Sequence, residues 1–215
     1  MLFNWILISI KKMDIINNKQ KAIQELRRIS ERTISGNNKK IDSIVEEILQ
    51  EVKTHGDNAV EKYTQKFDGF IPKPMQVSSK DLKNAWDETD NHLKKSLENA
   101  YQRIKKFHEK EIPESFTLKG EHGESVQRRW MPVKSAGLYI PGGRAAYPST
   151  VLMNAIPAKV AGVKEISMVS PGNEKGIINK TVLAAAHLSG IDKVFRIGGA
   201  QAIGALAFGT NQINK

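Results

Sequence analysis

The sequence contains no cysteine and no long uninterrupted apolar run. The absence of cysteine excludes disulfides, thiolate metal sites and cysteine nucleophiles. The apolar N-terminal stretch, residues 1–10, is much shorter than the roughly 20 residues that a membrane helix needs. It also lacks the preceding positive charge and the small-residue cleavage site of a secretory signal. We therefore predict a cytoplasmic protein that does not contact membranes, and we expect Met13 to be the true first residue.

Acidic side chains are scarce in the C-terminal part of the chain. The whole sequence of 215 residues carries a formal net charge of +10, and residues 133–215 hold nine basic but only three acidic side chains. A chain of this length fits one large domain or two small ones and is long enough to bury a core. The net positive charge indicates either an anionic ligand or a nucleic-acid partner.

The nucleic-acid alternative rests on pairs of basic residues such as Lys11–Lys12 and Arg128–Arg129. These pairs are dispersed along the chain and lack the interleaved aromatic residues of base-stacking surfaces. Dispersed lysines and arginines are typical of a solvated surface. A basic nucleic-acid-binding module is kept as the alternative function, and our main prediction includes no nucleic-acid partner.

The first part of the chain shows mainly helical periodicity. Apolar residues from Ile41 to Val52 follow one face of a helix, and Asp57 is predicted to cap the helix that comes next. A short strand is expected to end near Val77, and Asp90 is expected to cap a later helix. Residues 115–133 alternate loosely, which favours one or two strands, and we place a domain boundary at the end of this stretch.

The second part alternates between short buried strands and helices. This β–α–β–α–β–α order predicts a parallel sheet with crossover helices. The expected strands are residues 137–140, 165–169 and 193–197, and the expected helices are residues 149–161, 178–188 and 200–208.

Two Gly-Gly turns, at residues 142–143 and 198–199, each follow a predicted strand and precede a predicted helix. Open parallel sheets bind ligands outside the carboxyl ends of their strands. Glycine lets backbone N–H groups approach an anion, and a helix N-terminus adds partial positive charge. A phosphate or pyrophosphate group therefore fits these turns. The same Gly-Gly sequences are also typical of tight turns that bind no ligand. Neither turn matches the G-x-G-x-x-G or P-loop pattern.

Two polar residues beside these turns are unusual for their surroundings. Tyr139 lies in an otherwise aliphatic strand directly before the first turn, and Gln201 lies in the first turn of an almost wholly apolar helix. A carboxamide at that position is suited either to a polar ligand or to the backbone at the helix end, and position alone supports both interpretations.

Long stretches of this sequence resemble histidinol dehydrogenases. The resemblance is strongest in residues 137–164, GLYIPGGRAAYPSTVLMNAIPAKVAGVK, and in residues 196–210, RIGGAQAIGALAFGT. Residues 52–69, VKTHGDNAVEKYTQKFDG, and residues 103–109, RIKKFHE, resemble the same family. The similarity runs from about residue 20 to the end of the chain.

The resemblance implies an NAD-dependent and zinc-dependent homodimer that oxidises L-histidinol through histidinal to L-histidine, the last step of histidine biosynthesis. It implies an α/β fold of aldehyde-dehydrogenase-like architecture, in which residues 1–32 form an N-terminal extension and arm. Residues 33–132 are then a helix-rich α/β region that forms part of the first domain. Residues 133–215 are an incomplete Rossmann-like domain in which Tyr139 and Gln201 contact NAD.

The resemblance also implies that the chain is the N-terminal half of such an enzyme. The catalytic Glu–His pair and the zinc ligands of the family follow the part that this chain matches, so we expect no catalytic and no metal-ligating residue here. The chain alone is then expected to be inactive, and a catalytically dead remnant that binds NAD or an intact subunit is a further alternative.

The five histidines are not spaced as metal ligands on one helix. No two of them are three or four residues apart, and such spacings are usual in structural zinc sites. Glu121-His122 superficially copies an acid–base pair, but it lies between glycines outside the matching motifs, and we expect it on the surface.

Overall fold

The computed structural model describes residues 15–34, 39–142 and 145–215. Residue contacts divide the chain into two units, residues 1–43 and 44–215. The first unit contains helix α1 (Lys19–Ile34), in which the Asn18 side chain accepts a hydrogen bond from the Lys21 amide at 3.0 Å. The expectations for Met13 and residues 1–10 lie outside the described residues. No described helix is long and apolar enough to cross a membrane.

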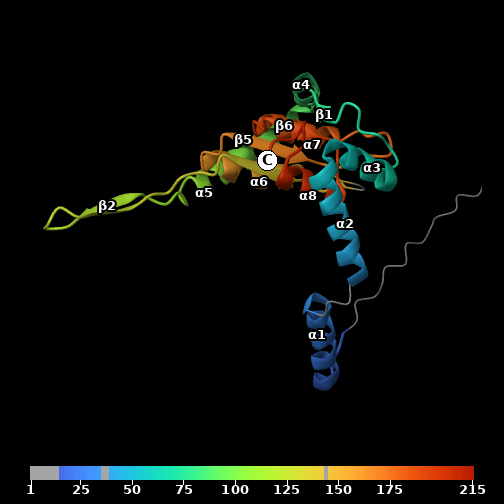
Figure 1. The fold of residues 1–215 in the computed structure, drawn as a ribbon, viewed down its shortest axis with the longest axis horizontal. Coiled ribbons are helices and arrows are strands. Elements are labelled where there is room, and N and C mark those ends of the chain that lie inside the picture. Colours follow the sequence, from blue (N-terminus) through green and yellow to red (C-terminus); the bar gives the residue numbers. More distant parts are fainter. Residues whose placement is uncertain (1–14, 35–38, 143–144) are drawn as a thin grey trace, which may run out of the picture. The chain divides into compact units, whose positions relative to one another are not determined.

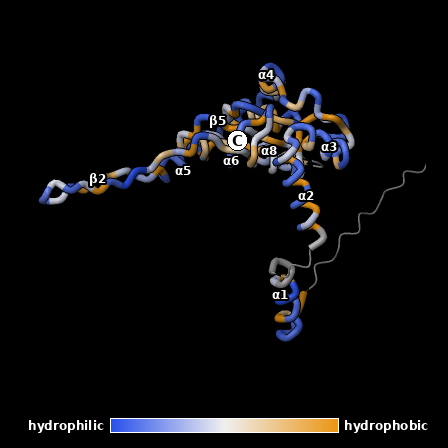
Figure 2. The backbone as a smooth tube through the Cα atoms, in the orientation of Figure 1, coloured by the Kyte–Doolittle hydropathy of each residue, from blue (hydrophilic) through white to orange (hydrophobic). Residues whose placement is uncertain are grey.

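Four helices follow in the order that the periodicity predicts. Asp90 caps the last of them as expected, because its carboxylate accepts a hydrogen bond from the His92 amide at 2.8 Å. The prediction that Asp57 caps a helix is wrong. Gly56 occupies that position, with φ 54°, and its carbonyl accepts the first helical hydrogen bonds, which makes Asp57 the first helical residue. The four helices are α2 (Lys39–His55), α3 (Asp57–Asp68), α4 (Ser79–Asp87) and α5 (Asn91–His108). In Figure 2, hydrophobic and hydrophilic residues alternate along α2, as in an amphipathic helix.

The predicted β–α alternation is present in residues 135–208. Strands β4 (Ser135–Tyr139), β5 (Glu165–Val169) and β6 (Lys193–Phe195) pair in parallel. The helices between and after them are α6 (Pro148–Val160), α7 (Lys180–Leu188) and α8 (Gly199–Phe208) (Figure 1). The fold is therefore mixed α/β with a parallel sheet.

The helix-rich region 33–132 also contributes a strand to this sheet. Strand β1 (Gln76–Val77) pairs antiparallel with β6, which gives the strand order β1-β6-β5-β4. The two regions expected from the sequence therefore meet in one sheet. The remaining strands, β2 (Phe116–Lys119) and β3 (Ser125–Arg128), form a separate antiparallel hairpin.

Two buried clusters cover the two faces of the sheet. One cluster joins α4 and α5 to α6 and α7, and the other joins α2 and α3 to α8. Helix α8 therefore lies on the opposite face of the sheet from α6 and α7. It packs closely against β4, because a Cβ at Gly137 would lie 3.0 Å from the Leu206 side chain. This arrangement brings the beginning of α8 to the end of β4.

Asp68, the last residue of α3, has a carboxylate oxygen that is buried without a hydrogen-bond partner among the described residues. Burial raises the pKa of the Asp68 carboxyl above its ordinary value of 3.8, because desolvation disfavours the charged form. The stability that protonated Asp68 contributes is thus present below pH 3.8 and is lost as pH rises through the folded-state pKa. Asp68→Asn is expected to increase the free energy of unfolding at pH 8 more than at pH 4, as measured by urea denaturation.

Asp87 supplies the matched control. Its carboxylate hydrogen-bonds Lys83 Nζ at 2.5 Å, and this contact lowers the pKa of Asp87. Its contribution is therefore present above its ordinary pKa and is lost as pH falls through the lowered value. Asp87→Asn is expected to decrease stability at pH 8. If Asp68→Asn, like Asp87→Asn, decreased the free energy of unfolding at pH 8, the prediction would be contradicted.

Candidate functional site

Three loops meet at the carboxyl ends of β4, β5 and β6. Pro171, in the loop after β5, lies between the two glycine turns. A Cβ at Gly142 would lie 2.6 Å from the Pro171 carbonyl oxygen, and a Cβ at Gly198 would lie 2.6 Å from the Pro171 side chain. Only glycine permits such close approach at both positions. The glycines therefore bring the three strand ends together at the edge where parallel sheets bind ligands.

Tyr139 joins the end of β4 to the beginning of α8. Its hydroxyl accepts a hydrogen bond from the Gly199 amide at 3.1 Å. Gly199 has φ 66°, in the left-handed region where glycine carries no steric penalty. The Tyr139 ring is half-buried at the last residue of its strand, and its hydroxyl proton is left free for a further acceptor.

Gln201 lies beside the same glycine. It is only 1 % exposed, yet neither atom of its carboxamide has a hydrogen-bond partner among the described residues. A Cβ at Gly199 would lie 2.5 Å from Gln201 Oε1, so the carboxamide is folded against the turn. Buried unsatisfied polar groups are rare and costly, which makes this side chain a candidate ligand-binding group. The structure thus brings Tyr139 and Gln201, both selected from the sequence, next to the same residue, Gly199.

The helices that follow the glycine turns begin without a side-chain cap. Helix α6 begins after Tyr147 and helix α8 after Gly198, and neither residue makes a capping hydrogen bond. Both helices also lack acidic residues in their first turn. By contrast, Ser78, Asp90 and Asn179 cap α4, α5 and α7. Uncapped amides and the helix dipole favour an anion at the N-termini of α6 and α8.

A cavity of about 290 Å³ lies next to these loops. It is lined by the loops after β4 and β5 and by the first turn of α7, including Gly142, Ser170 and Lys180. Lys180 Nζ is bound to Glu88 Oε2 at 2.5 Å, which holds that ammonium group on the α4 side. The cavity therefore offers a mixed apolar and polar space next to the glycine turns.

The other residues weighed in the sequence do not join this site. No group of three or more His, Cys, Asp or Glu side chains in the described ranges is placed to hold a metal ion. Glu121 and His122 lie exposed in the turn between β2 and β3, as expected. His108 Nδ1 is 2.5 Å from Glu111 Oε2 at the end of α5, and His187 lies next to the Trp86 ring.

Sequence reasoning missed the part that Pro171 plays. The tripeptide Ser170-Pro171-Gly172 directly follows the buried strand β5, so its place at the same sheet edge could have been inferred. Its packing between both glycine turns could not, because that contact depends on the spacing of the three strands.

Comparisons with known proteins agree with this architecture. The family model described as histidinol dehydrogenase matches residues 31–215. The chain belongs to the histidinol dehydrogenase family. A histidinol dehydrogenase from Prochlorococcus marinus MED4 is 87% identical over 203 residues, which are 94% of this chain and 47% of that protein. One from a Synechococcus strain is 43% identical over 94% of this chain and 47% of that protein.

A solved structure of a histidinol dehydrogenase is also similar to this chain. The crystal structure of histidinol dehydrogenase from Elizabethkingia anophelis is 36% identical, with a TM-score of 0.77 over 81% of this chain and 40% of that one. The chain thus spans about half the length of the curated histidinol dehydrogenases that it matches. The family membership agrees with the resemblance stated from the glycine-turn motifs.

Proposed function

We propose that this chain is the NAD-contacting N-terminal portion of a histidinol dehydrogenase, which oxidises L-histidinol through histidinal to L-histidine. The observation that carries the proposal is the arrangement of Tyr139, Gly199 and Gln201 at the strand ends. Family membership supplies the reaction. The finer fold description, an incomplete Rossmann-like domain in an aldehyde-dehydrogenase-like enzyme, belongs to the same proposal, as do the homodimer and the cytoplasmic location.

The residues at the strand ends fit NAD. Gly142 and Gly198 make room for Pro171 where the strand ends meet, and the uncapped N-termini of α6 and α8 can supply amide donors to a pyrophosphate. The Gln201 carboxamide can donate one hydrogen bond and accept another, and it lacks partners within the described chain. The Tyr139 hydroxyl, fixed by the Gly199 amide, can donate its proton to a ligand oxygen. When bound, the nicotinamide ring accepts hydride from the alcohol.

The described residues do not fit the zinc ion that the family uses. They contain no group of three or more potential ligands, whereas a catalytic zinc ion typically takes three protein ligands. We therefore assign no metal-dependent step to this chain. The proposal places zinc binding and acid–base chemistry in the portion of the relatives that this chain does not match.

Isothermal titration of the chain with NAD tests the proposal. We expect saturable binding, and we expect Tyr139→Phe to weaken it by roughly 3–10-fold, the value of one lost hydrogen bond. Tyr101→Phe is the matched control, because Tyr101 is a half-buried tyrosine on α5 that packs against the other core cluster. A folded chain that gives no heat with millimolar NAD would overturn the proposed cofactor role.

A further inference from the structure

Residues 170–178, which we call the β5–α7 loop, form one wall of the cavity beside the glycine turns. Several members of this loop line the cavity of about 290 Å³, namely Ser170, Pro171, Asn173, Ile177 and Ile178. Pro171 is also the residue that packs between the two glycine turns. The position of the β5–α7 loop therefore determines the shape of the space at the strand ends, where the proposed function places NAD.

Hydrogen bonds hold the tip of this loop together but do not join it to the rest of the described chain. The Asn173 side chain accepts hydrogen bonds from the Lys175 and Ile177 amides, each at 3.0 Å. The Gly176 amide donates to the Asn173 carbonyl at 2.7 Å. Among the described residues, residues 171–177 form no hydrogen bond or ion pair with a residue outside the loop. Packing must therefore fix the position of the tip.

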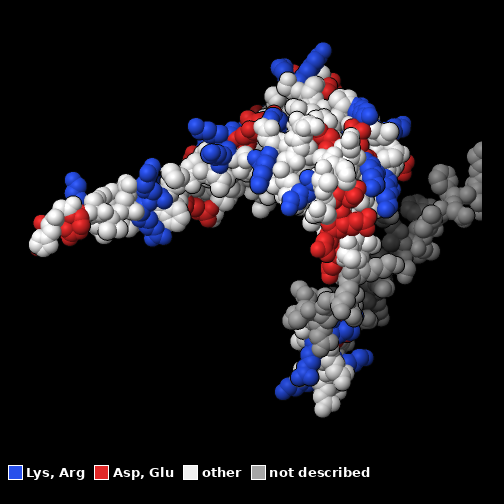
Figure 3. Space-filling view, viewed as in Figure 1, with Lys and Arg blue, Asp and Glu red and all other residues white. Residues whose placement is uncertain are grey.

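Ion pairs join other elements of the chain. Lys62 Nζ lies 2.9 Å from Glu51 Oε2 and joins α3 to α2, over which acidic side chains gather in Figure 3. The β5–α7 loop also carries charged side chains, Glu174 and Lys175, but neither forms an ion pair with a described residue. Charge therefore does not fix this loop.

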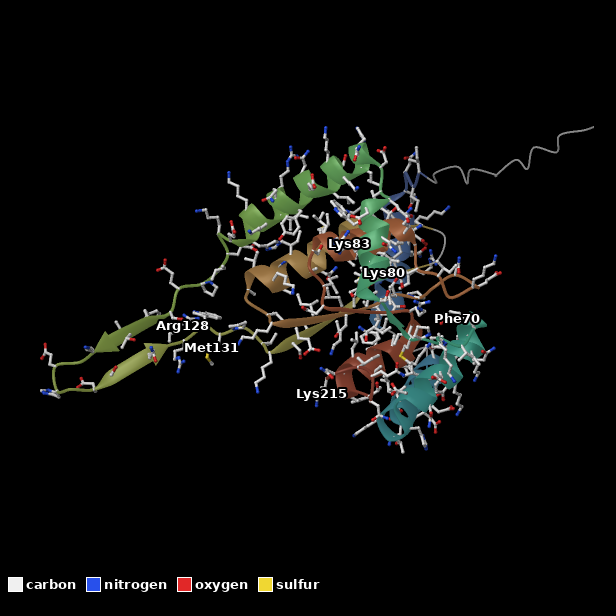
Figure 4. The ribbon with its side chains drawn as sticks, turned by 90° about the horizontal axis from the view of Figure 1, so that it is seen from above. Phe70, Lys80, Lys83, Arg128, Met131 and Lys215 are labelled. Atoms are coloured by element: carbon white, nitrogen blue, oxygen red, sulfur yellow. The ribbon has the colours of Figure 1, made fainter. Side chains whose placement is uncertain are left out.

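The Phe70 ring supplies a packing contact to the tip of the loop. A Cβ at Gly176 would lie 2.8 Å from this ring, so the ring packs directly on the Gly176 backbone. Gly176 is buried, although Glu174, Lys175 and Ile177 around it are exposed. In Figure 4, Phe70 lies at the end of α3, beside this loop. The ring therefore covers the one buried residue of the tip.

Close contacts continue from this ring to the strand ends. A Cβ at Gly172 would lie 2.5 Å from the Gly176 carbonyl carbon, so the two glycines pack against each other. Pro171, the residue before Gly172, packs between the glycine turns after β4 and β6. Protein interiors that are packed this closely transmit a displacement from one group to the next. Loss of the Phe70 ring is therefore expected to displace the loop as far as Pro171.

The chain holds Phe70 in place from both sides. Before it, Gly69 ends α3 in the left-handed region, with φ 76°, and turns the chain away from the helix axis. After it, Met75 is only 1 % exposed in the core cluster of α2, α3 and α8. The Met75 carbonyl also accepts a hydrogen bond from the Arg196 amide at 3.0 Å. Phe70 is therefore a fixed point against which the loop can pack.

We propose that Phe70 is a positioning residue for NAD, which holds the β5–α7 loop in its binding position by packing on Gly176. The ring acts through the loop and does not touch the ligand. A loop that is already ordered loses less conformational entropy when a ligand binds, and this strengthens binding. The inference rests on the proposed function, because it takes NAD as the ligand at the strand ends.

Isothermal titration of the full chain with NAD is the first test. Phe70→Ala is expected to raise the dissociation constant about 5–20-fold, because the loop must then be ordered when NAD binds. Phe70→Leu keeps an apolar side chain over Gly176 and is expected to stay within about twofold of wild type. Phe67→Ala is the matched control, because the Phe67 ring is 52% exposed and stacks on Tyr63. It is expected to leave the dissociation constant unchanged.

Amide hydrogen exchange measures the order of the loop without NAD. Phe70→Ala is expected to speed exchange of the Gly176 and Ile177 amides at least about tenfold, because the tip loses its packing contact. Phe67→Ala is expected to leave this exchange at the wild-type rate. Circular dichroism shows whether each variant keeps the wild-type helix content.

A double-mutant cycle tests the contact between Phe70 and Gly176 directly. The methyl group of Gly176→Ala meets the Phe70 ring, and φ 70° at this position is also strained for alanine. The variant is therefore expected to weaken NAD binding. In the Phe70→Ala background only the backbone strain remains, so Gly176→Ala is expected to weaken binding at least about threefold less. Two independent structural effects would instead add.

A wild-type chain that binds no NAD would refute the proposed function and, with it, the ligand of this inference. When wild type binds NAD, the inference alone is overturned by wild-type affinity or wild-type loop exchange in Phe70→Ala. An equal effect of Phe67→Ala, or additive effects in the cycle, would also overturn it. If Phe70→Ala does not fold, Gly176→Ala decides, and NAD affinity equal to wild type in that variant overturns the inference.

Discussion

The purified chain is expected to show no histidinol-dependent reduction of NAD, with or without added zinc. The described residues contain no cluster of potential metal ligands, and His108 and His187 lie on other elements than the strand-end loops. A positioned acid–base group contributes about 10²–10⁴-fold to such a reaction. None of the described histidines lies in the strand-end loops, so we expect NAD bound at the proposed site to lack a group that takes the alcohol proton.

Activity is expected to appear when the portion of the relatives that this chain does not match is supplied. Co-expression with the C-terminal half of the Prochlorococcus marinus MED4 relative should raise the rate at least about 100-fold above either half alone. Strand β4 lies at the end of the sheet order, and no other described strand pairs with its outer edge, so we expect this edge to pair with the added half. The measurement is absorbance of NADH at saturating histidinol.

Each half assayed alone is the control for that experiment. Robust turnover by the 215-residue chain would refute the assignment of the acid–base and zinc groups to the other half. A co-purified, folded pair that binds NAD but does not turn over would refute the proposed reaction itself.

Gln201→Leu is expected to change stability and NAD affinity in opposite directions. Leucine has a similar volume and no polar atoms, so it removes two buried groups that lack partners in the described chain. The free energy of unfolding is expected to rise by about 1–2 kcal/mol. The dissociation constant for NAD is expected to rise by about 10–100-fold, because the ligand loses one donor and one acceptor. Urea denaturation and isothermal titration measure the two effects.

Gln102→Leu is the matched control for this variant. Gln102 is exposed on α5, and its replacement is expected to alter neither stability nor NAD binding appreciably. A Gln201→Leu variant that is destabilised and binds NAD like wild type would show that the carboxamide serves packing. A gain in stability with weaker binding is the signature of a group kept for its ligand.

Hydrophobic periodicity predicted most of the fold. The spacing of apolar residues located the helices in residues 41–108, and the alternation of short strands with helices predicted the parallel sheet. These signals are local, because each helix or strand buries one face that is written into its own residues. The prediction for Asp57 failed at the start of a helix. Gly56 is the single residue between α2 and α3, and it is the N-cap of α3 because its backbone carbonyl accepts the first helical hydrogen bonds.

The sequence also drew attention to the two polar side chains of the candidate site. Tyr139 and Gln201 were conspicuous because each interrupts an apolar stretch next to a glycine turn. Their common position next to Gly199 was not predictable from the sequence, since they are 62 residues apart and belong to different elements. The sequence likewise could not predict that the Gln201 carboxamide lacks hydrogen-bond partners among the described residues, because this depends on which groups surround it after folding.

By itself, the sequence determined the family motifs, the order of helices and strands, and the excess of basic over acidic residues in residues 133–215. Only the tertiary structure decided that β1 joins the sheet, that Pro171 separates the two turns, and that the Phe70 ring packs on Gly176. The physical reason is distance along the chain. Periodicity and capping act within a few residues, whereas strand pairing and close glycine contacts depend on segments that meet only after folding.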